Sequence, residues 1–163
     1  LNREALEHGG TYSWILADDK PIIDRTGSGD AGAFSPDNAP AAGRYIIGDF
    51  HTHPYTRYTD GIEDIPNVSW SGGDLFYTVA WGRFFDTMQT HKTIFGVLRT
   101  AATPRDTANN AEDVFDNAFQ SHITDSTGEA FRKAIREAAK DTCNRFDLAY
   151  YEGEDTRTLS KVS

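Results

Sequence analysis

Apolar and polar residues along this chain alternate between short strand-like runs and helical stripes. Branched and aromatic residues gather in five short segments, which predicts strands at 11–17, 21–23, 44–50, 93–99 and 146–151. Three other stretches carry apolar residues at spacings of three and four, which predicts amphipathic helices from Leu75 to Phe84, over 111–119 and over 131–143. This order favours a single α/β or α+β sandwich over a repeat protein.

Local signals predict where some of these elements begin and end. Residues 1–7 read as the end of a helix that Gly9-Gly10 stops as a C-cap. Ser126-Thr-Gly-Glu129 reads as a capping box at the start of the third helix. Two segments without periodicity, 24–42 and 55–70, are expected to be long loops, which in compact domains are often functional.

Composition limits the class of protein. The net charge of -9 disfavours binding to a nucleic-acid backbone, whereas an acidic surface suits an enzyme and could attract a basic partner. The single cysteine, Cys143, excludes an intrachain disulfide, and its place on the apolar stripe of the third helix predicts a buried packing residue rather than a nucleophile. No apolar run is long enough for a membrane span. Because the sequence starts at Leu1 rather than Met, we expect a piece of a longer protein, whose compartment stays unknown.

Two histidines, His51 and His53, directly follow the apolar run Tyr45-Ile46-Ile47. Residues two apart on a strand point to the same face, so the two imidazoles can converge at the end of the strand. Zinc accepts neutral imidazole, and a catalytic zinc site needs a third protein ligand and one open position. The alternative is a pair of surface histidines in a turn, because an isolated His-x-His is a weak motif.

A third ligand is available downstream, where Ser71 and Asp74 lie three apart at the start of a predicted helix. By themselves these residues would be read as an N-cap and an acidic first-turn residue. Asp74 is also not the sole carboxylate available. The other candidates nearby are Asp60, Glu63 and Asp64. The remaining histidines are His8, His91 and His122, the last expected to be a surface or packing residue near a helix end.

A general base is also needed, and Glu7 is the candidate, because the glycines that follow it let the backbone approach a site closely. On composition alone Glu7 would be an ordinary exposed helix residue. The combination of Glu7-His8-Gly9-Gly10, His51-Thr52-His53-Pro54 and Ser71-Gly72-Gly73-Asp74 resembles the signature of the JAMM (JAB, MPN-plus) zinc metalloprotease superfamily. The resemblance covers about residues 7–98.

The resemblance implies a fold, a cofactor and roles. The fold would be a JAB/MPN-like, cytidine-deaminase-like α/β sandwich in one domain, 1–163, with a central mixed sheet flanked by helices. Its catalytic core would span about 1–100, and a C-terminal helical part with a last strand about 105–152. Zn²⁺ would be bound by His51, His53 and Asp74. Glu7 would move a proton from the zinc-bound water to the leaving amine, and Ser71 would stabilise the oxyanion.

The activity expected from this resemblance is cleavage of a peptide or isopeptide bond in a protein or peptide substrate. We expect the segment 55–70 to form a substrate wall or lid, with Tyr55, Tyr58 and Trp70 as substrate-binding residues. The sequence also resembles the C-terminal toxin domain of a large secreted bacterial protein behind Rhs-type repeats, an effector delivered to a target-cell cytoplasm. Such a domain would have a cognate immunity protein as partner.

Two alternatives stay open. Phe50-His51-Thr52-His53 also resembles the first-strand motif of amidohydrolase and phosphoesterase barrels, which act on other amide or phosphoester bonds but need about 250 residues. A metal-free MPN-like interaction module is the other, although all five signature positions are filled here.

Overall fold

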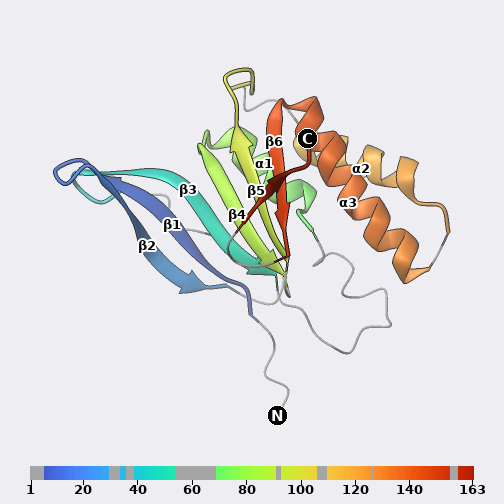
Figure 1. The fold of residues 1–163 in the computed structure, drawn as a ribbon, viewed down its shortest axis with the longest axis horizontal. Coiled ribbons are helices and arrows are strands. Elements are labelled where there is room, and N and C mark those ends of the chain that lie inside the picture. The colour runs from blue at the N-terminus through green and yellow to red at the C-terminus, as the bar shows by residue number, and fades with distance from the viewer. Residues whose placement is uncertain are drawn as a thin grey trace, which may run out of the picture.

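The chain folds into one mixed α/β domain with a seven-stranded mixed sheet and three helices, as the sequence predicted in outline (Figure 1). This computed structural model describes residues 6–29, 34–35, 39–53, 69–90, 93–105, 110–125, 127–154 and 158–163. The strands are β1 (His8–Ile15), β2 (Lys20–Ser28), β3 (Arg44–His53), β4 (Phe85–Thr90), β5 (Thr93–Arg99), β6 (Leu148–Gly153) and β7 (Ser160–Lys161). The helices are α1 (Gly72–Ala80), α2 (Ala111–His122) and α3 (Gly128–Arg145).

The sheet has the order β2-β1-β3-β4-β5-β6-β7, and its neighbouring strands are antiparallel except at one place. β3 and β4 are parallel, which requires a crossover, and α1 lies in that crossover. The C-terminal end of β3 and the N-terminal end of α1 therefore belong to the same β-α-β unit. This unit carries both histidines of the predicted site and the aspartate.

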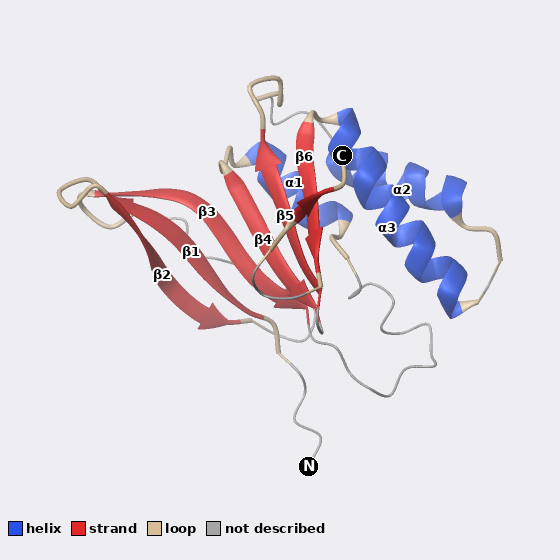
Figure 2. Ribbon diagram, viewed as in Figure 1, coloured by secondary structure: helices blue, strands red, loops and turns tan. Residues whose placement is uncertain are grey.

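The core lies between one face of the sheet and the helices, which Figure 2 shows beside the strands β4 to β6. Met88, Phe95, Val97 and Tyr150 occupy facing register positions on β4, β5 and β6 and are all buried. They pack with Leu75 and Val79 of α1, Ala111 and Phe115 of α2, and Ile135, Ala138, Ala139 and Cys143 of α3. The same face of β3 continues toward the edge of this core, where the polar site begins.

The sequence misplaced several boundaries. Gly9 and Gly10 are not a helix C-cap but lie inside β1, and Glu7 precedes that strand outside any helix. Residues 85–90 form β4, which was missed because Phe84 and Phe85 extended the apolar pattern of α1. Phe84 is 64% exposed and lies beyond the helix, which ends at Ala80.

Three further predictions need adjustment. β2 continues to Ser28, so the loop predicted from residue 24 starts five residues later than expected. The N-cap of α3 is Thr127, whose hydroxyl accepts a hydrogen bond from the Ala130 amide, rather than Ser126, which lies outside the described residues. The last strand, predicted over 146–151, spans Leu148–Gly153 as β6, and β7, which the sequence did not predict, pairs with it. In the described part of the chain, no helix combines the length and the apolar character that crossing a membrane would need.

Candidate metal centre

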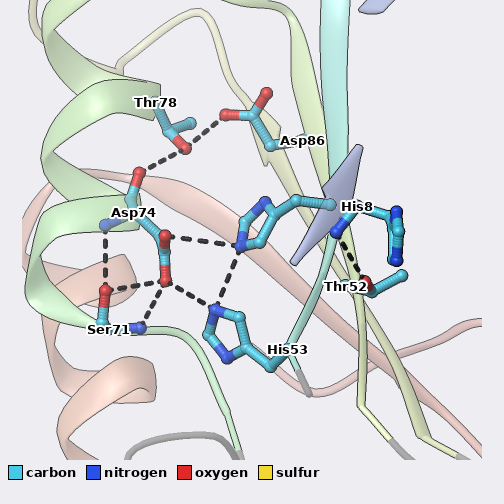
Figure 3. Close-up of polar contacts among 8 residues, drawn as sticks. His8, Thr52, His53, Ser71, Asp74, Thr78 and Asp86 are labelled. Atoms are coloured by element: carbon cyan, nitrogen blue, oxygen red, sulfur yellow. Dashed lines mark hydrogen bonds and ion pairs between the residues drawn. The ribbon is translucent and has the colours of Figure 1, made fainter. Parts of the chain in front are cut away.

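Three side chains from two elements converge at the end of β3, as the sequence predicted. His51 and His53 extend from β3, and Asp74 from the first turn of α1. The two Nε2 atoms are 3.1 Å apart; His51 Nε2 is 3.4 Å from Asp74 Oδ1, and His53 Nε2 is 3.5 Å from Asp74 Oδ2. Figure 3 shows the Asp74 carboxylate directed at the imidazole of His53. Three potential ligand atoms therefore face one point.

The spacing of these atoms fits a tetrahedral metal ion. Zinc binds imidazole nitrogen and carboxylate oxygen at about 2.0–2.2 Å, so two ligands of a tetrahedral site lie roughly 3.3–3.5 Å apart. Two of the measured separations lie close to that edge length: 3.1 Å between the two Nε2 atoms and 3.4 Å between His51 Nε2 and Asp74 Oδ1. The 3.5 Å distance from His53 Nε2 is to the other oxygen of the same carboxylate, Asp74 Oδ2. The donor set of two imidazoles and one carboxylate is also the set that leaves a fourth position open in catalytic sites. The residues therefore fit such an ion.

The capping interaction at α1 holds the Asp74 carboxylate in place. Its Oδ2 accepts hydrogen bonds from the Ser71 backbone N–H (2.8 Å) and from the Ser71 hydroxyl (2.7 Å). The Ser71 Oγ in turn accepts from the Asp74 N–H at 3.2 Å, which completes a capping box (Figure 3). Because Oδ2 is occupied by these two donors, Oδ1 is the oxygen left to face a metal. The predicted N-cap, Ser71, thus holds the predicted ligand, Asp74.

Charge interactions tie the triad together. Burial alone would lower the pKa of His51, but the Asp74 carboxylate, with smaller contributions from Glu7 and Asp86, raises that pKa above its usual value. Burial likewise would raise the pKa of Asp74, yet the two imidazoles outweigh it and hold that pKa well below its usual value. Without a metal, the site therefore favours an ionised aspartate next to a protonated histidine. A bound cation would replace that proton.

Glu7 lies beside this triad, as the sequence predicted, although not on a helix. Gly9 is the register partner of His51, and the His8 N–H donates to Thr52 Oγ1 at 3.0 Å, so the same register places Glu7 opposite His53. Side chains at facing positions of an antiparallel pair point to the same face. Glu7 is buried, with 5% of its surface exposed, and its backbone carbonyl accepts from the Gly29 N–H. A carboxylate is therefore held next to the ligands.

A second buried carboxylate, Asp86 of β4, was missed by the sequence analysis. Its Oδ2 accepts a hydrogen bond from the Thr78 hydroxyl (Figure 3). Its Oδ1 accepts another from the Asp49 N–H at 3.1 Å. Burial, together with the nearby Asp49 charge, raises the pKa of Asp86 to about 7, against the opposing effect of Thr78. One side chain thus connects α1, β3 and β4 next to the metal ligands. The available signal was a polar residue at an inward position of a strand, Asp86-x-Met88-x-Thr90.

A cavity of about 280 Å³ opens beside the triad. His51 and Asp74 line one side, and the carboxylates of Asp49 and Asp86 lie on the strands beneath. The other lining residues are mostly aromatic: Phe34, Ser35, Phe50, Trp70, Tyr77 and Trp81. A site with an open metal position and an adjoining pocket can bind a substrate group next to the reacting bond.

The remaining predicted residues are placed as follows. Trp70 is fully buried and packs edge-on against His51, with ring centroids 5.7 Å apart, so it supports the ligand as well as lining the cavity. His8 is exposed, and His122 ends α2 with its Nε2 2.7 Å from Asp141 Oδ2, as expected of a surface residue. Cys143 is fully buried in the core, as predicted. The other candidates lie outside the described residues: Tyr55, Tyr58, Asp60, Glu63, Asp64 and His91.

Comparison with known proteins gives no match for this chain among protein-family models, curated proteins or solved structures. The argument for function therefore depends on the site.

Proposed function

We propose that this chain is a zinc-dependent hydrolase that cleaves a peptide or isopeptide bond. The observation that carries the proposal is the convergence of His51, His53 and Asp74 at the spacing of tetrahedral zinc ligands, with the buried Glu7 beside them. The histidines and the aspartate come from one β-α-β unit, and Glu7 immediately precedes the neighbouring strand β1. We assign the fold to the JAMM (JAB/MPN-plus) superfamily on the signature that these residues share with it.

Each residue has a role that its surroundings support. His51, His53 and Asp74 hold the ion, which when bound would act as a Lewis acid and lower the pKa of a water to about 7. Glu7, buried beside them, accepts a proton from the attacking water and returns it to the leaving nitrogen. Ser71 directs Asp74 by two hydrogen bonds. For Ser71 to donate to an oxyanion as well, its hydroxyl has to leave Asp74 Oδ2, while the backbone N–H of Ser71 keeps that oxygen in place.

The biological setting is a further part of this proposal. We infer a bacterial toxin or effector domain that acts on a protein in a target-cell cytoplasm, with a cognate immunity protein as its partner. The resemblance of the sequence to domains behind Rhs-type repeats is the support for this setting.

Metal content and turnover test the proposal together. The purified chain is expected to bind one zinc per molecule, measured by elemental analysis after dialysis, and His51→Ala with His53→Ala is expected to lose it, because one protein ligand is too few. His122→Ala is the matched control, since this histidine pairs with Asp141 away from the site. Full zinc retention in the double variant would disprove the metal centre.

The general base is tested in the zinc-loaded protein. Glu7→Gln is expected to keep zinc and the fold but to reduce peptide-bond hydrolysis by a factor on the order of 10²–10⁴, because an amide cannot accept the proton. Mass spectrometry of a peptide library and of ubiquitin-like conjugates gives the readout. If Glu7→Gln retains activity within a factor of about two of the parent chain, Glu7 is not the base.

A further inference from the structure

We infer that the cavity beside the metal ligands is a specificity pocket for a cationic side chain, lysine or arginine, of the substrate. The inference rests on the proposed function, because it concerns which residue of a peptide substrate lies next to the bond that is cleaved. It starts from the chemistry of the cavity lining.

The floor of the cavity is acidic. Asp49 and Asp86 are register partners on the parallel strands β3 and β4, and both line the cavity together with Asp74. None of the described residues that line it is Lys or Arg. The nearest cation is Arg83, whose Nε donates to Asp49 Oδ2 at 2.8 Å. The lining therefore has three carboxylates against this one arginine.

A zinc ion would not remove this surplus of negative charge. Its two positive charges would be matched by the carboxylates of Asp74 and Glu7, which lie next to it. Asp49 and Asp86 then remain on the floor, with Arg83 as their counter-charge. One negative charge is left for a substrate cation when both acids are ionised, which for Asp86 means above its pKa of about 7.

One acceptor on the floor lacks a donor. Asp49 Oδ1 is buried and has no hydrogen-bond partner in the described part of the chain, although Oδ2 is paired with Arg83. A buried carboxylate oxygen without a donor is costly, and a ligand N–H would satisfy it. Lysine and arginine supply such donors with a positive charge, which makes the hydrogen bond about twice as strong as a neutral one.

The walls suit the apolar part of such a side chain. Tyr77 of α1 and Trp81, the C-cap residue one turn later, have ring centroids 6.1 Å apart and are 54% and 50% exposed. Across the cavity, Phe34 lies over Gly9 and Gly27, and a Cβ at Gly9 would come within 2.5 Å of its ring. Aromatic faces attract cations and pack against the methylene stem. The two glycines leave the room in which Phe34 forms the opposite wall.

The size and position of the cavity fit a single lysine or arginine side chain of the substrate. The volume, about 280 Å³, is at the small end of ligand pockets, which measure about 300–1,000 Å³. Asp49 precedes His51 by two residues, so the floor lies about 7 Å along the strand from the metal ligand. An extended lysine or arginine side chain spans such a distance from a scissile bond at the metal to the carboxylate.

Binding, measured without turnover, tests the pocket. Nα-acetyl, C-terminal methylamide derivatives of arginine, lysine, norleucine, phenylalanine and glutamate are titrated into the chain, with and without one equivalent of zinc, and followed by NMR of the backbone amides. Arginine and lysine derivatives are expected to bind on the order of tenfold more tightly than norleucine, as for one hydrogen bond to a charged group. Norleucine or phenylalanine binding as tightly as arginine would overturn the inference.

Two variants locate the binding. Asp49→Asn is expected to abolish the preference for cations while leaving norleucine binding unchanged. Trp81→Leu, at a half-exposed position that leaves the fold intact, is expected to weaken arginine binding roughly threefold, the size of an exposed cation–π contact. Phe84→Leu is the matched control, because Phe84 is exposed but does not line the cavity. An equal loss in Phe84→Leu and Trp81→Leu would contradict the assignment.

The two proposals fail in different ways. A chain that binds the arginine derivative selectively but cleaves no peptide with zinc present would disprove the hydrolase and keep the pocket. A chain that cleaves peptides equally well with arginine, norleucine or glutamate beside the scissile bond would disprove the pocket and keep the hydrolase.

Discussion

Replacing Asp86 by Asn is expected to raise the free energy of unfolding at neutral pH but not in acid. In the folded chain the Asp86 carboxyl is buried between Thr78 and Asp49, and burial raises its pKa from 3.8 to about 7. Between these two values the folded state binds a proton that the unfolded state has released. The free energy of unfolding therefore decreases as the pH rises from about 4 to about 7, and levels off above that.

The structure indicates why Asn is a suitable replacement. When Asp86 is protonated, one oxygen accepts from the Asp49 N–H and the other donates to Thr78 Oγ1, whose own proton can turn to the Asp74 carbonyl 3.2 Å away. The amide of Asp86→Asn reproduces this pattern at every pH. The difference between 3.8 and about 7, at about 1.4 kcal/mol per pH unit, corresponds to about 4 kcal/mol. The variant avoids that loss.

Urea unfolding in the presence of a chelator, at several pH values from 4 to 8, measures the effect. The stability of Asp86→Asn relative to the parent chain is expected to rise from near zero at pH 4 to several kcal/mol at pH 8. Asp74, whose pKa is lowered, also makes the free energy of unfolding decrease toward acid. This contribution is common to both chains and cancels in the difference. Asp116→Asn is the control for the change of charge, since Asp116 is exposed on α2. A stability difference that does not vary with pH would refute the reasoning.

Two further predictions concern residues away from the ligands. Cys143→Ser is expected to lower the free energy of unfolding by about 1–3 kcal/mol, because it places a hydroxyl in the apolar core. Zinc content and turnover are expected to stay unchanged. Lost turnover with intact zinc would instead indicate thiol chemistry. The second change replaces residues 57–67, which lie outside the described part of the chain, by a short Gly/Ser linker. This change is expected to preserve zinc content and melting temperature and to reduce activity on the true substrate. Unchanged turnover would show that this segment takes no part in binding.

Strong local patterns predicted the fold class and most of the elements. The apolar stripes of α2 and α3 and the branched runs of β1, β3 and β5 each have a clear period, and each forms close to where it was expected. β4 was missed because Phe84, just before it, continues the helical spacing of α1, so the period alone could not mark the helix end. Trp81-Gly82 was the available signal, since Gly82 adopts a positive φ of 67° just after the helix.

Sequence reasoning predicted the convergence of His51, His53 and Asp74 but not the surroundings of these side chains. His51 and His53 needed only the period of a strand, and Asp74 the Ser71-x-x-Asp74 pattern at the start of a helix together with the family resemblance. Asp86 and the cavity depend instead on the register between β3 and β4, which sets Asp49 beside Asp86. No local pattern encodes that register, because parallel strands are paired through a crossover and not through a turn.

The helix cap at Ser71-x-x-Asp74 is observed, and it is compatible with the proposed role of Asp74 as a metal ligand. A capping box requires the aspartate at the third helical position to bend back toward the N-cap N–H, and here Asp74 Oδ2 accepts that bond from Ser71. The bend also fixes the rotamer of Asp74 and turns Oδ1 toward His51, 3.4 Å away. The helix stability that the cap supplies is therefore what orients the ligand before any ion binds. The same residues would look like an ordinary cap in a chain without the two histidines, so spacing alone could not separate the two interpretations.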